Sequence, residues 1–503
     1  MLNLKMNAIH IFYNLYLTVS DGLNAARRIL LLSFLCFSAA YWILSVSDAT
    51  AQENNTETET AVSEISLGLE DAVNIAVAVN RDILKSAFRL KNQKLSLRTA
   101  RSDFDLKIFP NASGGVGGDE SETQKSFGAG LSLQKKLTLG PRISLEPEIK
   151  KGDTSYESGL GVSFEIPLFR GAGREVTLDG VYTAEYSIRN AERSHYQTLV
   201  STVLSTISAF YEVEKQKSLV RLNENLKNRM YGHAETARAK EKVGLATPID
   251  VYRAEIQLKN VEDRLTGAVE SLRSAEDELK TILTLPLETG VTVIAPLKCE
   301  DIHVTETKAI ETAVKKRWET EQAEDDFNHV VRQSKIAKNK LLPELKIVGN
   351  YSRLGTSEDF DQSMTFDEDR WGFQVIADTD LSRDSEKANY QKSLTNIKNA
   401  GLRIKEVREN IIKEVRSHLR FTDKAKARIG IRQEQIVQAE GKLALAQVKF
   451  NFGMATNFDL IEAETELERA RSELLSAKID YIVGTYKFRA VLGTLIERSA
   501  IHN

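Results

Sequence analysis

The sequence predicts a mainly α-helical protein with a smaller β-sheet part, in which long antiparallel coiled-coil helices are duplicated. Three observations predict this class. Long charged segments carry apolar residues at helical spacing, and two regions, 107–168 and 343–381, change to an apolar alternation with a period of two. The sequence motif "GLATPID" at 244–250 is also repeated in similar form as "GMATNFD" at 453–459. One unit of helix, strands, long helix, tip and helix therefore occurs twice.

The composition bounds the class of protein. The chain has 503 residues, of which 42% are hydrophobic and 28% are charged, as is ordinary for a folded chain. Its formal net charge of -3 gives no basic field for a nucleic acid, so no nucleic-acid partner is expected. The chain contains eight prolines, and this scarcity suits long uninterrupted helices.

The N-terminal residues predict a targeting segment. Arg27 and Arg28 precede an apolar run over 29–46, and Ala49-Thr50-Ala51 fits a cleavage site of small residues. We therefore expect residues 1–51 to be a cleaved signal peptide. An uncleaved membrane anchor is the alternative, because the run is about as long as a minimal membrane span.

Downstream of this segment the chain divides into a flexible polar lead-in over 52–66, a first repeat over 67–299, a second repeat over 300–497 and a tail over 498–503. No second apolar span occurs in these residues, so no transmembrane helix is expected after cleavage. Cys299 would be the single remaining cysteine, which predicts a chain without an intramolecular disulfide.

The two repeats have the same order of elements. For the first we expect a helix over 69–101, strands over 107–168, a long helix over 172–243, the tip at 244–250, a helix to 285 and a connector to 299. For the second we expect a helix over 305–341, strands over 343–381, a long helix over 385–451, the tip at 453–459 and a helix to 495. In the strand regions apolar residues alternate with small or polar ones, as Phe127, Ala129, Leu131 and Leu133 do. This pattern predicts strands with one apolar face.

The two tips match residue by residue at an offset of 209. The glycine of each tip allows a backbone conformation that other residues avoid, and it ends the preceding helix. Thr247 in the first tip, and Thr456 or Asn457 in the second, can cap the next helix. Asp250 and Asp459 lie in the first turn of that helix, where the helix dipole favours negative charge. The sequence alone leaves open whether these residues have any role beyond the turn and the cap.

The helices after the tips carry a coiled-coil seam. In the second repeat the seam residues, at a spacing that averages 3.5, are Leu460, Ala463, Leu467, Ala470, Leu474, Ala477 and Tyr481. Alanine layers between leucine layers let two helices approach closely. Each tip is therefore expected to join two antiparallel helices into a hairpin.

Four features together resemble the outer-membrane efflux protein family of TolC-like channels: the export segment, the two halves, the strand-to-helix text "FEIPLFRGAG" at 164–173, and the two tips. The resemblance covers about residues 67–495. It implies a homotrimer in which each chain gives four transmembrane strands to one twelve-stranded barrel in the outer membrane of a Gram-negative cell. The long helices would form a tunnel, or α-barrel, in the periplasm.

The resemblance also implies a function. The channel would be the passive exit duct of a tripartite efflux or type I secretion system. Substrates would be delivered by an inner-membrane RND or ABC transporter through a periplasmic adaptor (membrane fusion) protein. The tips would dock the adaptor through Gly244, Leu245, Thr247, Gly453, Met454 and Thr456. Asp459 and Glu462 match the family's acidic ring at the periplasmic entrance, with Asp250 and Arg253 as partners there.

Three departures from the family pattern stand out. Phe450 and Ala455 occupy positions where a family member can carry a tyrosine and a basic residue that hold the entrance closed, so any closure must be built differently. The second strand-to-helix junction, 377–388, lacks the expected proline and glycine. Residues 125–151 read as an additional hairpin, which we place on the extracellular side, with extra barrel strand length as the alternative.

Other classes of protein have less support. The chain contains no HExxH, CxxC, phosphate-loop or serine-nucleophile motif, so no catalytic residue, metal or cofactor is expected and the protein is predicted not to be an enzyme. A periplasmic structural coiled-coil protein would explain the seams but not the two strand regions. The substrate cannot be read from the sequence, because generic polar tunnel walls do not encode it.

Overall fold

A computed structural model describes residues 64–118, 123–301 and 304–497. The predicted signal peptide over 1–51, most of the predicted lead-in and the tail over 498–503 lie outside the described residues. Within the part that the structure describes, no helix is both long enough and apolar enough to cross a membrane.

The elements of the first repeat follow the predicted order. They are β1 (Glu64–Leu67), α3 (Leu69–Val79), α4 (Arg81–Ser102), β2 (Lys107–Gly118), β3 (Thr123–Lys136), β4 (Arg142–Lys151), β5 (Tyr156–Pro167), α5 (Arg174–Thr177), α6 (Asp179–Lys242), α7 (Pro248–Ile282) and β6 (Gly290–Val293). The second repeat has α8 (Glu306–Lys316), α9 (Trp318–Lys340), β7 (Glu344–Ser357), α10 (Phe360–Ser363), β8 (Glu368–Asp378), α11 (Asp384–Asn451) and α12 (Asn457–Val491).

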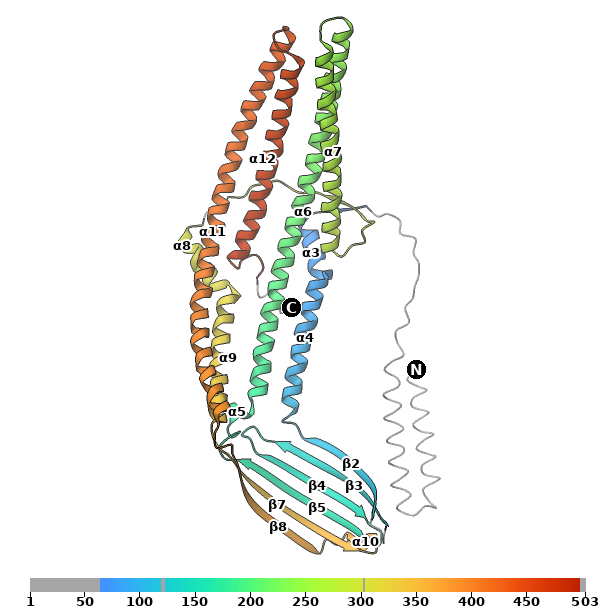
Figure 1. Cartoon of the computed structure of the whole chain (residues 1–503), viewed down its shortest axis with the longest axis vertical. Coiled ribbons are helices and arrows are strands. Elements are labelled where there is room, and N and C mark those ends of the chain that lie inside the picture. The colour runs from blue at the N-terminus through green and yellow to red at the C-terminus, as the bar shows by residue number, and fades with distance from the viewer. Residues whose placement is uncertain (1–63, 119–122, 302–303, 498–503) are drawn as a thin grey trace, which may run out of the picture. The chain divides into compact units, whose positions relative to one another are not determined.

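Two long helix hairpins dominate the structure, as Figure 1 shows. The first, called hairpin 1, is α6 and α7 joined at the first tip. The second, hairpin 2, is α11 and α12 joined at the second tip. Helix α4 packs against α6 and α9 packs against α11, and α12 also contacts α6. The helices α4, α6, α9 and α11 all meet the sheet at one of its ends (Figure 1).

Helix α12 is buried on two sides. Its predicted seam residues Leu460, Ala463 and Leu467 are buried. A Cβ at Gly484 would lie 2.9 Å from the ring of Phe421, which shows how closely α11 and α12 approach. Ile461 is buried in the cluster that α6 and α7 supply, because α12 also packs against hairpin 1.

Two predicted helices are each divided in the structure. The helix expected over 69–101 stops at Asn80, whose side chain accepts hydrogen bonds from the first turn of α4 and donates one to the carbonyl of Ile282 at 2.8 Å. The helix expected over 305–341 breaks at Arg317, whose backbone is extended with ψ at 135°. Its guanidinium pairs with Glu319 and Glu414. Side-chain contacts with distant segments therefore fix both breaks.

The predicted boundary between lead-in and first repeat is wrong in one respect. Residues Glu64–Leu67, most of which were assigned to a flexible lead-in, form β1, and β1 pairs in parallel with β6 of the predicted connector. Four-residue strands have little propensity of their own, so this pairing depends on what lies beneath it. That support is an apolar cluster in which Phe210 of α6, Leu279 of α7 and Ile482 of α12 are buried together.

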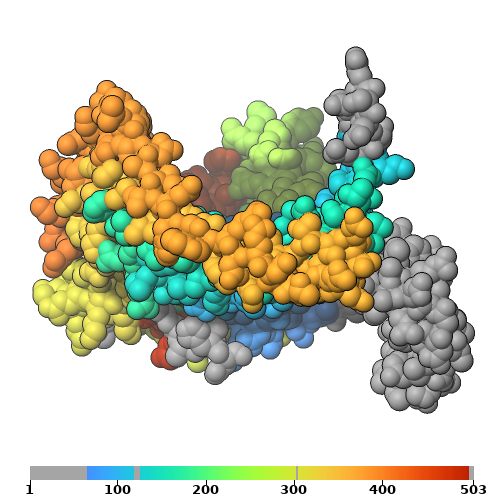
Figure 2. Space-filling view, turned by 90° about the horizontal axis from the view of Figure 1, so that it is seen from below, coloured from blue at the N-terminus to red at the C-terminus, as the bar shows by residue number. Residues whose placement is uncertain are grey.

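In the part of the chain that the structure describes, the sheet contains six strands in the order β2-β3-β4-β5-β7-β8, all antiparallel. The expectation of four strands per chain is therefore wrong, because the additional hairpin at 125–151 supplies β3 and β4. Its placement on the extracellular side is wrong as well. The turn after β3 lies at the helix end of the sheet, where the backbone N–H of Gly173 donates to the carbonyl of Leu139 at 3.0 Å. Figure 2, viewed from the sheet end, shows β7 and β8 in orange beside the teal β5.

The register places the apolar residues of all six strands on one face, here called the apolar face. Its members are Ile108, Ala112 and Val116 of β2, Phe127, Leu131 and Leu133 of β3, Ile143, Leu145 and Ile149 of β4, Leu160, Val162 and Phe164 of β5, Ile347 and Tyr351 of β7, and Trp371, Phe373 and Val375 of β8. The opposite face carries mostly small, polar and charged residues, with Phe109, Val348, Leu354 and Ile376 as exceptions. The predicted alternation is confirmed.

Candidate functional site

The two tips have the same backbone geometry. The N–H of Leu245 donates to the carbonyl of Lys240 at 2.8 Å, and the N–H of Gly244 donates to that of Glu241 at 2.9 Å. This pair of bonds is the Schellman motif that closes a helix end. Gly244 has φ at 72° and Gly453 has φ at 71°, a region that favours glycine. Both glycines are therefore required by the turn itself.

The predicted caps form in both tips. In the second, the carboxylate of Asp459 accepts from the N–H of Thr456 at 2.8 Å and from its hydroxyl at 2.7 Å. Asp250 and Thr247 repeat the arrangement at 3.0 and 2.7 Å. These hydrogen bonds, led by that from the threonine hydroxyl, lower the pKa of both aspartates below its usual value. Both carboxylates are therefore ionised at neutral pH.

The residues predicted to form the acidic ring lie one helical turn apart on α12, and both are exposed. Asp459 is held by the cap, while Glu462 lies 3.2 Å from the ammonium group of Lys442 on α11. The same ammonium group is 2.6 Å from Glu466. Within one chain, Lys442 therefore offsets part of the negative charge that the two predicted ring residues supply.

The other two predicted entrance residues are not paired with each other. Asp250 is engaged in the cap of its own helix, and the guanidinium of Arg253 lies 5.7 Å from the ring centre of Phe458 on α12. A second cation–π contact places the ammonium of Lys240 at 3.8 Å from the ring centre of Phe450. Phe450, which has no hydroxyl group, thus joins the two hairpins through its contact with Lys240. This cation–π contact stands at the position where the family pattern can have a tyrosine.

Sequence reasoning missed the apolar side chains that directly precede the tip glycines. Leu245 and Met454, which were predicted, are 76% and 75% exposed. Val243 and Phe452, each directly before its glycine, are 69% and 78% exposed and were not predicted. The sequences "VGL" and "FGM" place an apolar residue on each side of the glycine. An apolar residue before a turn is, however, usually interpreted as the end of a buried helix face.

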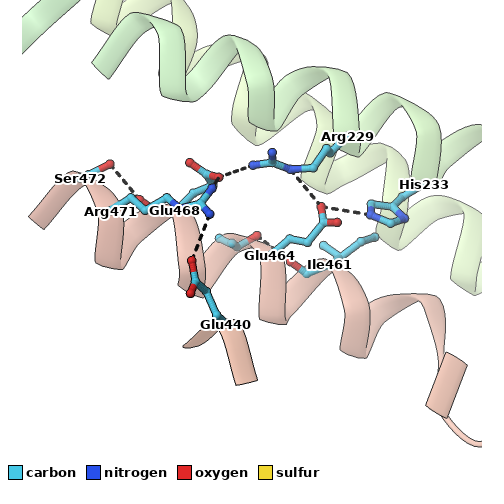
Figure 3. A network of polar contacts seen from close by, with 9 residues as sticks. Arg229, His233, Glu440, Ile461, Glu464, Glu468, Arg471 and Ser472 are labelled. Atoms are coloured by element: carbon cyan, nitrogen blue, oxygen red, sulfur yellow. Dashed lines mark hydrogen bonds and ion pairs between the residues drawn. The ribbon is translucent and has the colours of Figure 1, made fainter. Parts of the chain in front are cut away.

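An ion network, here called the inter-hairpin network, joins α6 of hairpin 1 to α12 of hairpin 2 and is drawn in Figure 3. The guanidinium of Arg229 on α6 contacts Glu468 and lies 3.5 Å from Glu464. His233, one turn further along α6, has its Nε2 3.1 Å from the same oxygen of Glu464. Arg471 extends the network by contacting Glu468 at 2.9 Å.

The carboxylates of this network are buried. The side chain of Glu464 is 10% exposed and that of Glu468 is 6% exposed. Among the described residues, one oxygen of each lacks a partner with hydrogen-bond geometry, while the other oxygen of Glu468 accepts hydrogen bonds from Arg229 and Arg471. A buried carboxylate is stable only while its counter-charge is present. The two hairpins are therefore coupled near the tips by a contact that is costly to break.

The sequence did carry a signal for this network. Glu464 and Glu468 stand four residues apart among the apolar residues of α12, and Arg229 and His233 have the same spacing on α6. Paired carboxylates beside a buried seam indicate a partner of opposite charge on a facing helix. The sequence could not say which helix faces them.

The cap at the second tip makes a prediction about pH. Replacing Asp459 with asparagine should speed amide hydrogen exchange in the first turn of α12 by roughly fivefold at pH 7, the equivalent of about 1 kcal/mol for a lost cap. The folded pKa of Asp459 is lowered, so its contribution is present above the unfolded pKa and is lost as pH falls through the folded one. The difference should therefore vanish at a pH well below about 3.9.

The matched control for this prediction is Asp480→Asn, on an exposed aspartate of the same helix that makes no cap. It should leave exchange in the first turn of α12 unchanged. Equal effects of the two substitutions would show that Asp459 does not cap the helix.

No group of three or more His, Cys, Asp or Glu side chains that could hold a metal ion occurs in the described residues. What the site offers is a hairpin end with exposed apolar tips, exposed carboxylates and a buried ionic contact between hairpins.

Comparison with known proteins gives a consistent result. The family model described as "Outer membrane efflux protein" matches residues 311–494, which is most of the second repeat. The outer membrane protein TolC of Vibrio cholerae is 22% identical over 401 residues, covering 76% of this chain and 86% of that protein. The probable efflux pump outer membrane protein TtgC of Pseudomonas putida is 22% identical over 447 residues, covering 84% and 82%.

Solved structures share the fold. The outer membrane channel CmeC of Campylobacter jejuni superposes with a TM-score of 0.67 at 14% identity, covering 89% of this chain and 92% of that one. The open state of the MtrE outer membrane channel of Neisseria gonorrhoeae gives 0.65 at 15% identity, covering 89% and 96%. The second repeat therefore matches the outer membrane efflux protein family, and the whole chain has the fold of the outer-membrane channels that it resembles.

Proposed function

We propose that three copies of the chain close one continuous barrel in the outer membrane and that their helix hairpins form a tunnel leading to it. The observation that carries the proposal is the apolar face, which runs across all six strands while the opposite face is mostly polar. A sheet with an apolar outside and a polar inside is what a water-filled barrel in a bilayer requires.

The edges of the sheet favour association of several chains. Strands β2 and β8 are the two edges, and each has a row of unpaired backbone groups within one chain. A bilayer offers no water to such groups, so an open sheet cannot remain in it. Strand β2 runs away from the helices and β8 runs toward them, so β8 of one copy can pair antiparallel with β2 of the next.

The tips supply the proposed docking surface for a periplasmic adaptor protein. The docking residues are those predicted, Gly244, Leu245, Thr247, Gly453, Met454 and Thr456, together with Val243 and Phe452. Apolar side chains exposed this strongly at a hairpin end mark a site for a partner. Relatives named for antibiotic and toluene efflux pumps favour small-molecule efflux as the transport task, with an inner-membrane transporter as the source of substrate.

The test of this proposal is recovery and conductance of the full chain. Membrane fractions should contain a heat-modifiable oligomer of three chains, and the purified oligomer should form ion-conducting pores in planar bilayers. The competing hypothesis is a structural coiled-coil protein of the periplasm. Exclusive recovery in the soluble periplasmic fraction would favour that hypothesis and end the channel proposal. The mass of the purified protein tests whether residues 1–51 are removed.

The proposed acidic ring makes a separate prediction. In a threefold assembly Asp459 and Glu462 would place six carboxylates around the entrance, and a ring of this kind attracts cations. The double variant Asp459→Asn with Glu462→Gln should weaken block by divalent cations several-fold and reduce cation selectivity. The control Glu235→Gln, on an exposed carboxylate of α6 paired within hairpin 1, should change neither property. Unchanged block in the double variant would mean that these residues do not face the pore.

A further inference from the structure

The hairpin of β3 and β4 is the largest departure of this chain from the four-stranded expectation. We propose that this hairpin is part of the membrane wall, so that three chains build a barrel of eighteen strands with a wider lumen than twelve strands would enclose. The inference rests on the proposed trimer but makes its own claim about each chain. Two other placements are conceivable for such a hairpin: inside the lumen as a plug, or outside the membrane as a loop.

The pairing of the strands excludes a separate hairpin within one chain. Strand β3 is bonded to β2 along twelve residue pairs, from Lys107 with Gln134 to Gly118 with Thr123. Strand β4 is bonded to β5 along ten pairs, from Arg142 with Glu165 to Lys151 with Tyr156. The hairpin therefore lies between β2 and β5 in the sheet. A plug or a loop would leave those two strands to pair directly with each other.

Between the ends of its strands, where Lys135 and Lys151 share the apolar face, the hairpin follows the same alternation as the rest of the sheet. Leu133 of β3 stands beside Leu145 of β4, and Leu145 stands beside Val162 of β5, all on the apolar face. Phe127, Leu131 and Ile143 are each more than 40% exposed on that face. A row of exposed apolar side chains would be unfavourable in a loop in water or in a plug within a polar lumen. Lipid contact accounts for them.

The other face of the hairpin suits the lumen. Strand β3 presents Ser126, Gly128, Gly130 and Ser132 there. Strand β4 presents Ser144, Glu146, Glu148 and Lys150 there, and the ammonium of Lys150 is 2.8 Å from the carboxylate of Glu148. Ionised side chains of this kind are costly against lipid and are stable in a water-filled channel. The hairpin thus has both faces that a strand of the barrel wall requires.

The turn of the hairpin fixes its depth. The N–H of Leu137 donates to the carbonyl of Pro141 at 2.7 Å, which closes a tight turn with Gly140 at φ 119°. A Cβ at Gly140 would lie 2.9 Å from the ring of Pro167 and 3.1 Å from the carbonyl oxygen of Gly171. The turn is packed on the strand-to-helix junction, so β3 and β4 span the same depth as β5.

The additional strands change the size of the barrel. At a strand spacing of about 4.8 Å and a tilt of about 40°, eighteen strands give a backbone diameter of about 36 Å, and twelve strands give about 24 Å. Each chain supplies six strands, which is an even number. Strand β8 of one copy and strand β2 of the next therefore run antiparallel where the copies meet. In such a channel the barrel does not limit the size of the cargo, and the helix tips become the narrowest point.

Imaging of the full-length oligomer in lipid nanodiscs tests the strand number directly. A threefold particle with a barrel about 36 Å across is expected. A threefold particle with a barrel about 24 Å across, and the hairpin outside the wall, would overturn the inference while leaving the channel proposal intact. Particles without threefold symmetry would instead contradict the trimer on which both rest.

Site-directed spin labelling tests the placement of the hairpin without depending on the trimer. In a background with Cys36→Ser and Cys299→Ser, a nitroxide at Leu131→Cys should be accessible to oxygen dissolved in lipid and protected from a water-soluble nickel complex. The adjacent Ser132→Cys, on the other face, should show the reverse. Val162→Cys on β5 provides the reference for a lipid-facing site. Water accessibility at both hairpin positions would place the hairpin outside the membrane wall.

Discussion

Replacing Arg229 with methionine should destabilise the contact between the two hairpins by about 3 kcal/mol, because removing one partner of a buried ion pair leaves a buried carboxylate with less counter-charge. Methionine retains most of the volume of the arginine stem, so the change is mainly electrostatic. Glu468 and Glu464 would both lose the arginine that joins them to α6, while Arg471 stays beside Glu468 and His233 beside Glu464. In planar bilayers the variant should show a higher conductance than the native channel, because the hairpins near the tips are released from each other.

Arg238→Met is the matched control for that experiment. Arg238 lies on the same helix, but it pairs with Glu235 and Glu255, both within hairpin 1, and its side chain is 46% exposed. Exposed pairs contribute about 1 kcal/mol or less, so its effect should be small. The double variant Arg229→Met with Glu468→Gln should recover part of the lost stability. Equal conductance in the native channel and in Arg229→Met would show that the inter-hairpin network does not hold the entrance.

Replacing Phe210 with alanine should destabilise the region where the two repeats meet by about 4 kcal/mol, the usual cost of a large cavity in a core. Phe210 is fully buried in the cluster beneath β1 and β6. Hydrogen exchange of the amides in β1 and β6 should become more than tenfold faster, because the pairing of these four-residue strands depends on the packing below them. Hydrogen exchange of the α12 amides that lie against this cluster should also become faster.

Phe210→Leu distinguishes cavity formation from loss of the ring. Leucine keeps most of the buried apolar volume, so its effect should be clearly smaller than that of alanine. If exchange in β1 and β6 were unchanged in Phe210→Ala, the two strands would be stable without the cluster. The dependence of their pairing on Phe210 would then be refuted.

The elements with strong local signals were predictable from the sequence. The tips are the clearest example, since Gly453, Thr456 and Asp459 each act through hydrogen bonds within a few residues of themselves. The alternation in the strands was equally readable, because every second side chain of a strand faces the same side. Strand β1 was not readable, because Glu64–Leu67 becomes a strand only by pairing with Gly290–Val293.

The candidate site likewise has a part that was predictable from the sequence and a part that was not. Thr456 and Thr247 were identified as helix caps with Asp459 and Asp250 in the first turn, and each pair forms a capping box. The further assignment of the two aspartates to an entrance ring is a prediction that one chain does not test. The inter-hairpin network escaped prediction because Arg229 and Glu468 are 239 residues apart, and no local pattern says that α6 will face α12. Lys240 over Phe450 was missed for the same reason.

The sequence by itself determined most of the helices, strands and turns, because those choices depend mainly on neighbours one to four residues away. It also indicated the duplication and the family resemblance, because both are patterns in the sequence. The tertiary structure decided that the hairpin at 125–151 enters the sheet, that β1 and β6 pair, and that buried carboxylates of α12 meet a cation on α6. Each of these depends on contacts between distant residues, whose free energy is gained only when the chain has already brought them together.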